Sequence, residues 1–370
     1  MNKIILDISP AFINRTAVYH MIMDIGSCLA KDFQIELSVL GKKIAKNQSP
    51  QLINELNSVR KKNLNKIISK HINNGFFKSF SYFLHNKPTA ADSIRLFFDP
   101  LYVPCSGLSS RDSVIVHDLT TLTFPEWHGV KVSEAYSRAF ARISNSRCQI
   151  ISDSESTTSE LRYHFGISYD RISTIPLYLR KEHSEPLKSN SSESCEKYFL
   201  FVGNLEKRKN LTGLIRAFEM TGLVNEGYSL KIVGMDGNGA GEIRELSKRV
   251  LGIELLGFVD EETLLSLYAN CRAFLYPSFW EGFGMPLLEA MAMGCVCVST
   301  QTGASPEVGG DAVLYVDPCS IDSIAAGILT VIRMEKKAIP VIKELSIARA
   351  KRFTFENYYN NLKKVITLRD

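Results

Sequence analysis

Residues 281–289 read Glu-Gly-Phe-Gly-Met-Pro-Leu-Leu-Glu, which places two carboxylates, two glycines and a proline within nine positions. We call this stretch the nonapeptide. Gly282 and Gly284 have no Cβ, so the backbone there can approach a ligand closely. Pro286 suits the first turn of a helix, where its missing N–H costs nothing. A helix that starts at this point would direct free backbone N–H groups outward, as an anion site requires.

The two carboxylates of the nonapeptide flank this predicted anion site. Glu281 lies in the loop before the predicted helix, and Glu289 lies one turn into it. Carboxylates accept hydrogen bonds from sugar hydroxyls, and backbone amides at a helix N-terminus hold a diphosphate. The nonapeptide therefore favours a ligand that carries both groups, a sugar nucleotide.

Outward from the nonapeptide, short apolar runs alternate with helical stretches. In the second half we predict strands at 198–202, 229–233, 253–255, 273–276, 296–299 and 313–316. The helices between them are predicted at 211–220, 240–250, 261–269, 286–292 and 321–333. The first half has predicted strands at 3–8, 35–40, 94–98, 113–117 and 149–152, and the tail 339–368 reads as two helices. This pattern indicates an α/β fold of two doubly wound, Rossmann-like domains.

Length and composition agree with two folded domains. The chain has 370 residues and is 45% hydrophobic, which is too long for one ordinary domain and too apolar for disorder. The stretch 181–197 is rich in Ser, Glu, Lys and Asn and is the predicted linker. We expect an N-terminal domain over 1–183 and a C-terminal domain over 196–351.

Several features predict a cytoplasmic protein. No apolar run reaches the roughly 18 residues that a membrane-spanning helix needs. The sequence opens with a strand-like Ile4-Ile5-Leu6, so we expect no secretory signal. The eight cysteines lack CxxC spacing, and Cys295 and Cys297 flank Val296 in a predicted buried strand. We interpret them as reduced thiols that serve as small hydrophobic side chains.

The positive charge is concentrated in residues 42–87, which hold ten Lys or Arg and a single acid, Glu55. Phe76, Phe77, Phe80, Tyr82 and Phe83 lie in the same stretch. Basic residues beside aromatics suit an anionic membrane surface, so we expect peripheral contact with the inner face of the plasma membrane. The alternative is a solvated basic helix followed by an ordinary core segment. No nucleic-acid partner is expected, because no recognised binding motif accompanies the charge.

Three further loops follow predicted strands, where ligands lie in open α/β sheets. Residues 203–210 read Gly-Asn-Leu-Glu-Lys-Arg-Lys-Asn. Asn210 can cap the next helix, and Lys209 and Arg208 can bind a diphosphate near its N-terminus; a solvated basic turn is the alternative. The glycine-rich 234–241 resembles a dinucleotide-binding fingerprint only loosely, and a flexible turn is the alternative. At 257–259, Gly-Phe-Val, the backbone can pair with a base edge and Phe258 can pack on the ring, or Phe258 is a buried residue in a turn.

Together with Thr-Gly-Ala-Ser-Pro-Glu at 302–307, these segments resemble glycosyltransferase family 4, a group of retaining enzymes with the GT-B fold. The resemblance covers about residues 110–335 and is strongest over 198–318, where it is closest to bacterial polysaccharide mannosyl- and rhamnosyltransferases. It implies two Rossmann-like domains that face each other across a cleft. It also implies a final helix, for which 352–370 is the candidate, that crosses back to the N-terminal domain.

The resemblance implies a role for each matching residue. Glu281 would contact the donor sugar, Glu289 would bind the ribose, and Lys209 would neutralise the leaving diphosphate. His117, in Val-Ile-Val-His-Asp-Leu-Thr at 114–120, matches a family histidine near the reacting sugar. The catalytic candidates are therefore Glu281, Lys209 and His117. The donor-binding candidates are Glu289, Arg208, Gly203, Asn204, Phe258, Val259, Phe283, Gly284, Met285 and Gly303.

The sequence departs from the family pattern at two places. Many members carry Arg where Asn204 stands, so the leaving group would depend more on Lys209 and Arg208. The glycine pair common near the family's N-terminus is missing from 9–20, Ser-Pro-Ala-Phe-Ile-Asn-Arg-Thr-Ala-Val-Tyr-His, and Arg15 is an unsupported substitute.

We therefore expect a retaining glycosyltransferase that moves a hexose, with mannose favoured, from a nucleotide diphosphate sugar to a hydroxyl of a glycan or lipid-linked glycan. Surface polysaccharide synthesis of the O-antigen or capsule type would fit. No D-x-D motif is present to carry a metal, so we expect no metal and no cofactor, with a GDP-mannose-like donor as substrate. The alternatives are a sugar-nucleotide epimerase of the same fold and a non-catalytic sugar-nucleotide-binding module. A nicotinamide enzyme is disfavoured because no strict G-x-G-x-x-G follows the first strand.

Overall fold

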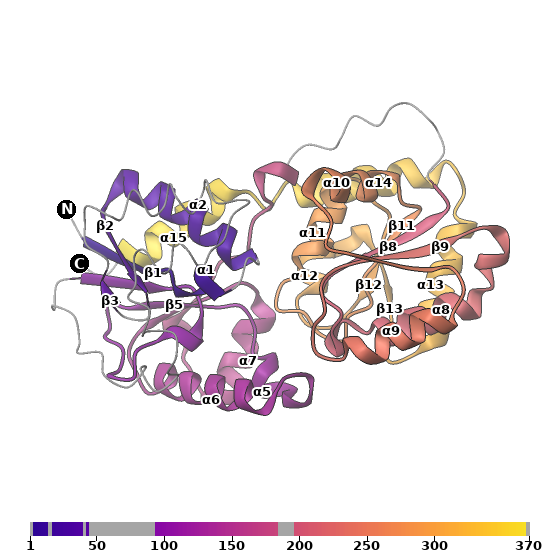
Figure 1. Cartoon of the computed structure of the whole chain (residues 1–370). Helices are drawn as coiled ribbons and strands as arrows, with labels where there is room; N and C mark the ends of the chain where they lie inside the picture. Colours follow the sequence, from indigo (N-terminus) through magenta and orange to yellow (C-terminus); the bar gives the residue numbers. More distant parts are fainter. Residues whose placement is uncertain (1–2, 14–16, 40–41, 44–92, 184–195, 368–370) are drawn as a thin grey trace.

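A computed structural model describes residues 3–13, 17–39, 42–43, 93–183 and 196–367. It consists of two α/β lobes that lie side by side, each built on one sheet with helices above and below it (Figure 1). The N-terminal lobe is formed by the first half of the chain and the final helix, and the C-terminal lobe by the residues between them.

The sheet of the N-terminal lobe has the order β3-β2-β1-β4-β5-β6-β7. All neighbours pair in parallel except β2 and β3, which are antiparallel. Its strands are β1 (Lys3–Asp7), β2 (Gln34–Val39), β3 (Lys42–Lys43), β4 (Ser93–Phe97), β5 (Ser113–Val116), β6 (Gln149–Ser152) and β7 (Ile172–Thr174). Its helices are α1 (Ser9–Ile13), α2 (Ala17–Asp32), α5 (Thr120–Thr123), α6 (Val130–Ser144) and α7 (Glu155–Phe165). The five predicted strands are confirmed to within one residue, whereas the short β3 and β7 were not predicted.

The sheet of the C-terminal lobe is wholly parallel, in the order β10-β9-β8-β11-β12-β13. Its strands are β8 (Tyr198–Val202), β9 (Ser229–Val233), β10 (Ile253–Gly257), β11 (Ala273–Leu275), β12 (Cys297–Thr300) and β13 (Val313–Val316). Its helices are α8 (Leu211–Thr221), α9 (Ala240–Arg249), α10 (Glu261–Asn270), α11 (Met285–Ala292), α12 (Ser305–Gly309), α13 (Ile321–Arg333) and α14 (Ala338–Ala350). The strand order reverses between β8 and β11, and such a switch point is where ligands bind in open parallel sheets.

Local signals at two helix starts had different outcomes. Asp260 caps α10 as predicted, because its side chain accepts the N–H of Thr263 at 2.8 Å. Asn210 precedes α8 with a left-handed φ of 55°, but its side chain does not cap the helix. The Asn210 amide instead donates to the carbonyls of Pro277 and Pro318, at 3.1 and 2.8 Å. The buried amide therefore connects three loops of the C-terminal lobe.

The last helix, α15 (Phe355–Thr367), lies beside α2 in the N-terminal lobe (Figure 1). The Tyr359 hydroxyl and the Lys363 ammonium both donate to one carboxylate oxygen of Asp32, at 2.7 and 2.8 Å. The chain thus passes between the lobes twice, once near Leu179 and once near Phe353. The two passages are joined where the Leu179 N–H donates to the Phe353 carbonyl at 2.9 Å.

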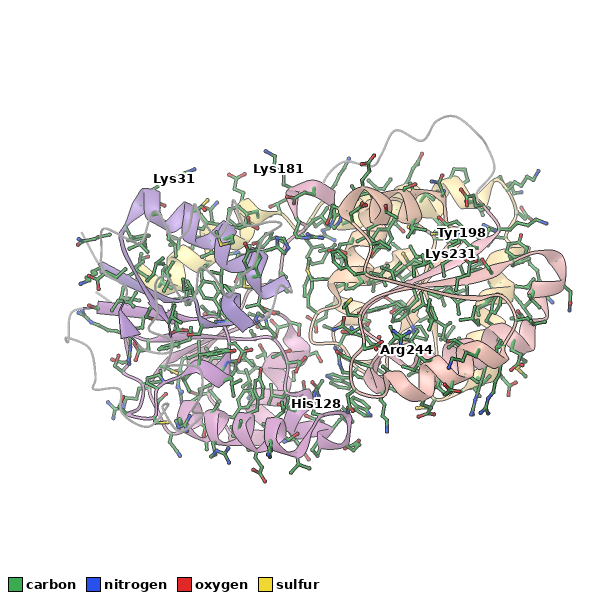
Figure 2. All side chains as sticks on the ribbon, in the orientation of Figure 1. Lys31, His128, Lys181, Tyr198, Lys231 and Arg244 are labelled. Atoms are coloured by element: carbon green, nitrogen blue, oxygen red, sulfur yellow. The ribbon has the colours of Figure 1, made fainter. Side chains whose placement is uncertain are left out.

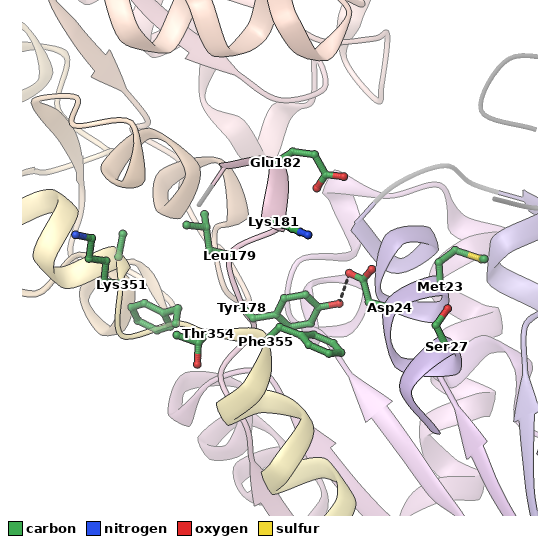
Figure 3. A pocket seen from close by; sticks show the side chains of 12 residues that line it. Met23, Asp24, Ser27, Tyr178, Leu179, Lys181, Glu182, Lys351, Thr354 and Phe355 are labelled. Carbon is green, nitrogen blue, oxygen red and sulfur yellow. Dashed lines mark hydrogen bonds between the residues drawn. The ribbon is translucent and has the colours of Figure 1, made fainter. Parts of the chain in front are cut away.

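A cavity of about 620 Å³ lies where these two passages meet. Its wall includes Tyr178, whose hydroxyl donates to the Asp24 carboxylate of α2 at 2.8 Å, and Phe355 at the start of α15 (Figure 3). Burial raises the pKa of Asp24 despite the Tyr178 hydrogen bond. This cavity lies at the hinge between the lobes.

Some predictions fall outside the described residues. The basic stretch 42–87 does so except for β3, as do Arg15 and most of the predicted linker. Within the ranges that the structure does describe, no helix has the length and apolar character needed to cross a membrane. The described thiols of Cys295 and Cys297 are buried and free, as expected.

Candidate active site

The loops after β8 and β11 bring three predicted residues into one buried cluster. Lys209 donates to one carboxylate oxygen of Glu281 at 2.7 Å, and Arg208 donates to the other at 2.7 Å. Lys209 also donates to the Tyr276 hydroxyl at 2.5 Å, and Arg208 donates to the Trp280 carbonyl at 2.8 Å. We call Glu281, Arg208 and Lys209 the charge cluster. It contains two cations and one carboxylate, so it carries a surplus of positive charge.

The electrostatics of the charge cluster are set by its burial and by mutual pairing. Burial alone would raise the pKa of Glu281, but the charges of Arg208 and Lys209 outweigh it and lower that pKa to about 2. Burial and the neighbouring Arg208 lower the pKa of Lys209. For Arg208, burial is opposed by Glu281 and the pKa is raised. The Glu281 carboxylate is therefore ionised at neutral pH.

Glycines hold the backbone around the charge cluster in place. Gly303 has a φ of 55°, and a Cβ there would lie 2.4 Å from the Glu281 carbonyl. The neighbouring Ala304 N–H donates to that same carbonyl at 2.9 Å. Gly203 ends β8 with a φ of 152°, and a Cβ on Gly234 would lie 2.0 Å from the Gly203 carbonyl. Gly303 and Gly234 thus allow the close backbone packing that positions the loops, and Gly203 contributes its carbonyl to the second of these contacts.

The nonapeptide begins α11 as predicted. Gly284 has a φ of 97° and precedes the helix, and Met285 and Pro286 form its first turn. Among the described residues, the N–H groups of Phe283 and Gly284 have no hydrogen-bond acceptor. The Met285 N–H lies in the first turn, where no intrahelical acceptor exists. Three successive donors at a helix start therefore form an arrangement suited to an anion.

Gly282 contacts the other lobe, not open space for a ligand. A Cβ at this position would lie 2.0 Å from the His117 carbonyl and 2.7 Å from the Asp118 Cβ. The prediction that the backbone at Gly282 approaches a ligand is therefore wrong. Its missing Cβ lets the nonapeptide touch the end of β5 in the N-terminal lobe, and this contact places His117 close to the charge cluster.

His117 is held within the N-terminal lobe by both ring nitrogens. Its Nδ1 lies 2.5 Å from the Asp153 carboxylate, and its Nε2 lies 3.0 Å from the Phe98 carbonyl. Burial acts to lower the pKa of His117, but Asp153, with Asp99 and others, raises it to about 9. The ring is therefore an imidazolium at neutral pH with both N–H groups donating, and in this state it cannot accept a proton.

Glu289 lies apart from the charge cluster, on the inner side of α11. One of its carboxylate oxygens is 3.2 Å from Arg180 and 3.4 Å from His183, and the other accepts from the Tyr268 hydroxyl at 3.3 Å. His183 also lies 2.6 Å from Glu261, and these carboxylates raise its pKa to about 9 against the opposing effect of burial. Arg180 and His183 were not predicted as site residues, because they lie in the charged run at the start of the predicted linker and match no motif.

The remaining donor-site candidates follow two strands of the C-terminal lobe, Asn204 after β8 and Phe258 and Val259 after β10. Asn204 is exposed, and its amide lies 3.4 Å from Glu206. Phe258 is 79% exposed, so the alternative of a buried residue in a turn is wrong, and Val259 packs partly against the core. An exposed ring next to the end of β10 is available for stacking. None of these three touches the charge cluster.

The two lobes meet at further contacts that the sequence did not predict. The Glu307 carboxylate accepts the N–H groups of Glu155 and Ser156, both at 2.7 Å, at the start of α7 in the other lobe. The Trp127 ring stacks on Phe279 with centroids 5.9 Å apart. Figure 2 shows His128, the next residue, on the end of the N-terminal lobe that faces the C-terminal lobe. The charge cluster is therefore flanked by an ion–helix contact and an aromatic contact.

Comparison with known proteins gives the same assignment for the C-terminal lobe. Residues 184–344 match the family model described as glycosyl transferases group 1. The O-antigen chain mannosyltransferase B of Escherichia coli is 32% identical over 252 residues, which are 65% of this chain and 66% of that protein. The O-antigen chain mannosyltransferase RfbU of Salmonella typhimurium is 26% identical over 218 residues, 57% of this chain and 58% of that protein. The chain thus spans less than two thirds of the length of either relative.

Solved structures share the whole architecture. Anabaena Alr3699/HepE in complex with UDP-glucose superposes with a TM-score of 0.70 at 14% identity, covering all of both chains. WaaG, a glycosyltransferase involved in lipopolysaccharide biosynthesis, gives 0.67 at 13% identity and covers 99% of each chain. At these identities the likeness shows the fold, which is GT-B.

Proposed function

We propose that this chain, whose residues 184–344 match the glycosyl transferases group 1 model and which has the GT-B fold, transfers a hexosyl group. The donor is a nucleotide diphosphate sugar, and the acceptor is a hydroxyl of a glycan. The observation that carries the proposal is the charge cluster beside the free N–H groups of the nonapeptide.

The charge cluster and the helix start supply what a departing diphosphate needs. Positive charge that is fixed before the reaction stabilises negative charge that develops on a leaving group. Lys209 and Arg208 provide that charge, and the Phe283, Gly284 and Met285 amides add donors at the start of α11. Glu281, ionised between the two cations, orients them and is available to the sugar hydroxyls. In this proposal Arg208 and Lys209 of the charge cluster act on the diphosphate, and Glu281 acts on the sugar.

We propose that the reaction proceeds without a metal ion, because two buried cations already offset the diphosphate charge. Activity should survive EDTA. Complete loss of activity with EDTA that Mg²⁺ restores would contradict this part of the proposal.

We propose retention of the anomeric configuration, by displacement on one face with leaving-group oxygens assisting deprotonation of the acceptor. His117, with both nitrogens donating and its pKa raised to about 9, is a cationic group for the sugar and not the base. Proton NMR of the first product formed would test this, since an inverted linkage would refute it.

Glu289 is proposed to bind the donor ribose while Arg180 and His183 hold its carboxylate in position. Glu289→Gln should raise the donor Kd about tenfold and leave kcat for saturating donor nearly unchanged. A fall in kcat without a change in donor affinity would contradict the assignment.

Mannose is the favoured sugar, because the relatives named above are O-antigen mannosyltransferases, and a GDP-mannose-like donor is the corresponding proposal. We propose the assembly of a surface polysaccharide on a lipid-linked glycan, in the cytoplasm at the inner face of the membrane, as the setting. A thermal-shift screen of nucleotide sugars identifies the donor, because a ligand that binds the folded state raises the melting temperature. A GDP sugar should give the largest shift.

A further inference from the structure

Two buried polar atoms without partners lie on opposite sides of the boundary between the lobes. One is the Oε2 atom of Glu160, in α7 of the N-terminal lobe, and the other is the Nε1 atom of Trp280, directly before the nonapeptide. Among the described residues neither atom has a hydrogen-bond partner, and both are screened from solvent. Such atoms are uncommon in folded proteins, because burial without a partner costs free energy. One atom is an acceptor and the other a donor, so each is the partner that the other lacks.

Glu160 and Trp280 are neighbours across this boundary. Burial and the charge of Asp118 raise the pKa of Glu160, whereas the Thr123 hydroxyl and the nearby Trp280 indole act to lower it. The Trp280 ring packs on Phe124 of the N-terminal lobe, with centroids 5.8 Å apart. Phe124 follows Thr123, whose hydroxyl donates to the Oε1 atom of Glu160 at 2.8 Å. The indole therefore lies against the part of the N-terminal lobe that holds Glu160, without a hydrogen bond between the two.

The backbone of Trp280 connects the lobe boundary to the charge cluster. Its carbonyl accepts a hydrogen bond from Arg208 at 2.8 Å. The next residue is Glu281, whose carboxylate accepts from Arg208 at 2.7 Å and from Lys209 at 2.7 Å. A displacement of the Trp280 ring towards the N-terminal lobe would therefore move the backbone that carries Glu281.

We propose that Glu160 is a positioning residue: when the lobes approach each other around a bound donor, its Oε2 atom accepts the Trp280 indole N–H and thereby fixes the backbone at Glu281. This hydrogen bond satisfies both unpartnered atoms at once. Glu160 acts through Trp280 and not on the substrate. The inference rests on the proposed function for the role of Glu281, but the hydrogen bond can be measured without transfer.

Four variants of the full chain separate the acceptor oxygen from the size of the side chain. Glu160→Met keeps the length and removes both oxygens. Glu160→Gln keeps one oxygen for the indole, because its amide can donate to the Thr123 hydroxyl, which donates onward to the Leu119 carbonyl at 3.2 Å. Trp280→Phe keeps an aromatic ring and removes the N–H. Glu134→Met, at an exposed glutamate of α6, is the control.

The kinetic test measures sugar transfer from GDP-mannose. Glu160→Met and Trp280→Phe should each lower kcat/KM about tenfold, the cost of one hydrogen bond. The double variant should lose no more than either single variant, because both changes remove the same bond. Glu160→Gln should restore kcat/KM to within about twofold of wild type, and Glu134→Met should match wild type. Additive losses, or a loss in Glu160→Gln as large as in Glu160→Met, would contradict the positioning role.

The spectroscopic test requires no transfer. The chain has two tryptophans, Trp127 and Trp280, so in a Trp127→Phe background the indole emission comes from Trp280 alone. GDP-mannose should shift this emission, because the indole N–H gains an acceptor. The shift should disappear with Glu160→Met and persist with Glu160→Gln. An emission that GDP-mannose leaves unchanged, or a shift of the same size in Glu160→Met, would overturn the inference.

The two tests distinguish this inference from the proposed function. Wild-type transfer by Glu160→Met, with the same emission shift as the unmodified side chain gives, would contradict the role of Glu160 alone. An emission shift that requires Glu160, in a protein that transfers no hexose from any nucleotide sugar, would support the hydrogen bond and contradict the transferase proposal.

Discussion

The two lobes arrange their buried charges in opposite ways where they meet. In the C-terminal lobe, one carboxylate, Glu281, lies between two cations, Arg208 and Lys209. In the N-terminal lobe, one cation, His117, is bonded to Asp153 and lies near Asp99 and Asp118. We infer that the positive surplus of the charge cluster serves the departing diphosphate and that Asp153 holds His117 as the cationic group near the sugar.

The largest effect should come from removing positive charge on the C-terminal side. Lys209→Ala should lower kcat for sugar transfer by about 10²–10³, the usual cost of losing one preorganised charge-stabilising group. Glu281→Gln should lower activity in the same range and also destabilise the fold by about 3–5 kcal/mol, because it removes the carboxylate charge that both buried cations pair with. Steady-state kinetics and thermal melts measure the two effects.

Glu206→Gln is the control for both variants, because Glu206 lies 3.6 Å from Arg208 and is partly exposed. It should change kcat less than threefold. Wild-type kinetics in both Lys209→Ala and Glu281→Gln would show that the charge cluster is not the catalytic centre.

The next variant tests whether transfer requires the contact that brings His117 of the N-terminal lobe next to the charge cluster of the C-terminal lobe. Gly282→Ala places a Cβ 2.0 Å from the His117 carbonyl, so the lobes must separate by an ångström or more. Transfer should fall about 10²-fold, since a displacement of this size misaligns reacting groups. Donor binding, which depends on the C-terminal lobe, should change little in a thermal-shift titration.

Gly241→Ala is the matched glycine control. It lies in α9, and a Cβ there meets nothing within 4 Å. Alanine should stabilise the helix by up to about 1 kcal/mol with no loss of transfer. If Gly282→Ala and Gly241→Ala have equal transfer kinetics, the contact between the lobes at Gly282 is not required for transfer.

A smaller effect is expected at the Glu307 contact. Glu307→Ala removes the acceptor for two N–H groups of α7 and should lower kcat/KM about tenfold, because each lobe remains folded and other contacts persist. Glu307→Gln keeps one acceptor oxygen, so its kcat/KM should lie between the values of wild type and Glu307→Ala. A tenfold loss in both variants alike would show that charge, and not the number of hydrogen bonds, matters there.

The smallest effect is on stability. The pKa of His117 is raised to about 9 in the folded state, against about 6.5 in the unfolded chain. Its bond to Asp153 therefore stabilises the fold fully below about pH 6.5 and loses this contribution as pH rises through 9. The melting-temperature difference between wild type and His117→Gln should shrink over that window. His183, which titrates in the same range, is present in both proteins and cancels; a constant difference would contradict the assigned state of His117.

The same contrast between lobes explains what the sequence could predict. The charge cluster lies in the loops after β8 and β11. These loops could be located from the sequence, because the strands before them are recognisable as apolar runs and the loops carry the charged residues Glu281, Arg208 and Lys209. The partners of Glu289 were not evident, because Arg180 lies 109 positions away and reaches it only through the passage between lobes. Gly282 was assigned to a ligand because a sequence does not show which backbone lies opposite. Strands β3 and β7, of two and three residues, are too short to give a periodic signal.

The central claim is that the charge cluster, and not a metal ion, stabilises the departing diphosphate. The most direct measurement is the rate of sugar transfer from the nucleotide sugar that gives the largest thermal shift, with EDTA and with Mg²⁺, for wild type and Lys209→Ala. We predict that wild type keeps its rate in EDTA, and that Lys209→Ala loses about 10²–10³ in kcat that Mg²⁺ does not restore. A wild-type enzyme that is inactive in EDTA and recovers with Mg²⁺ would contradict the claim.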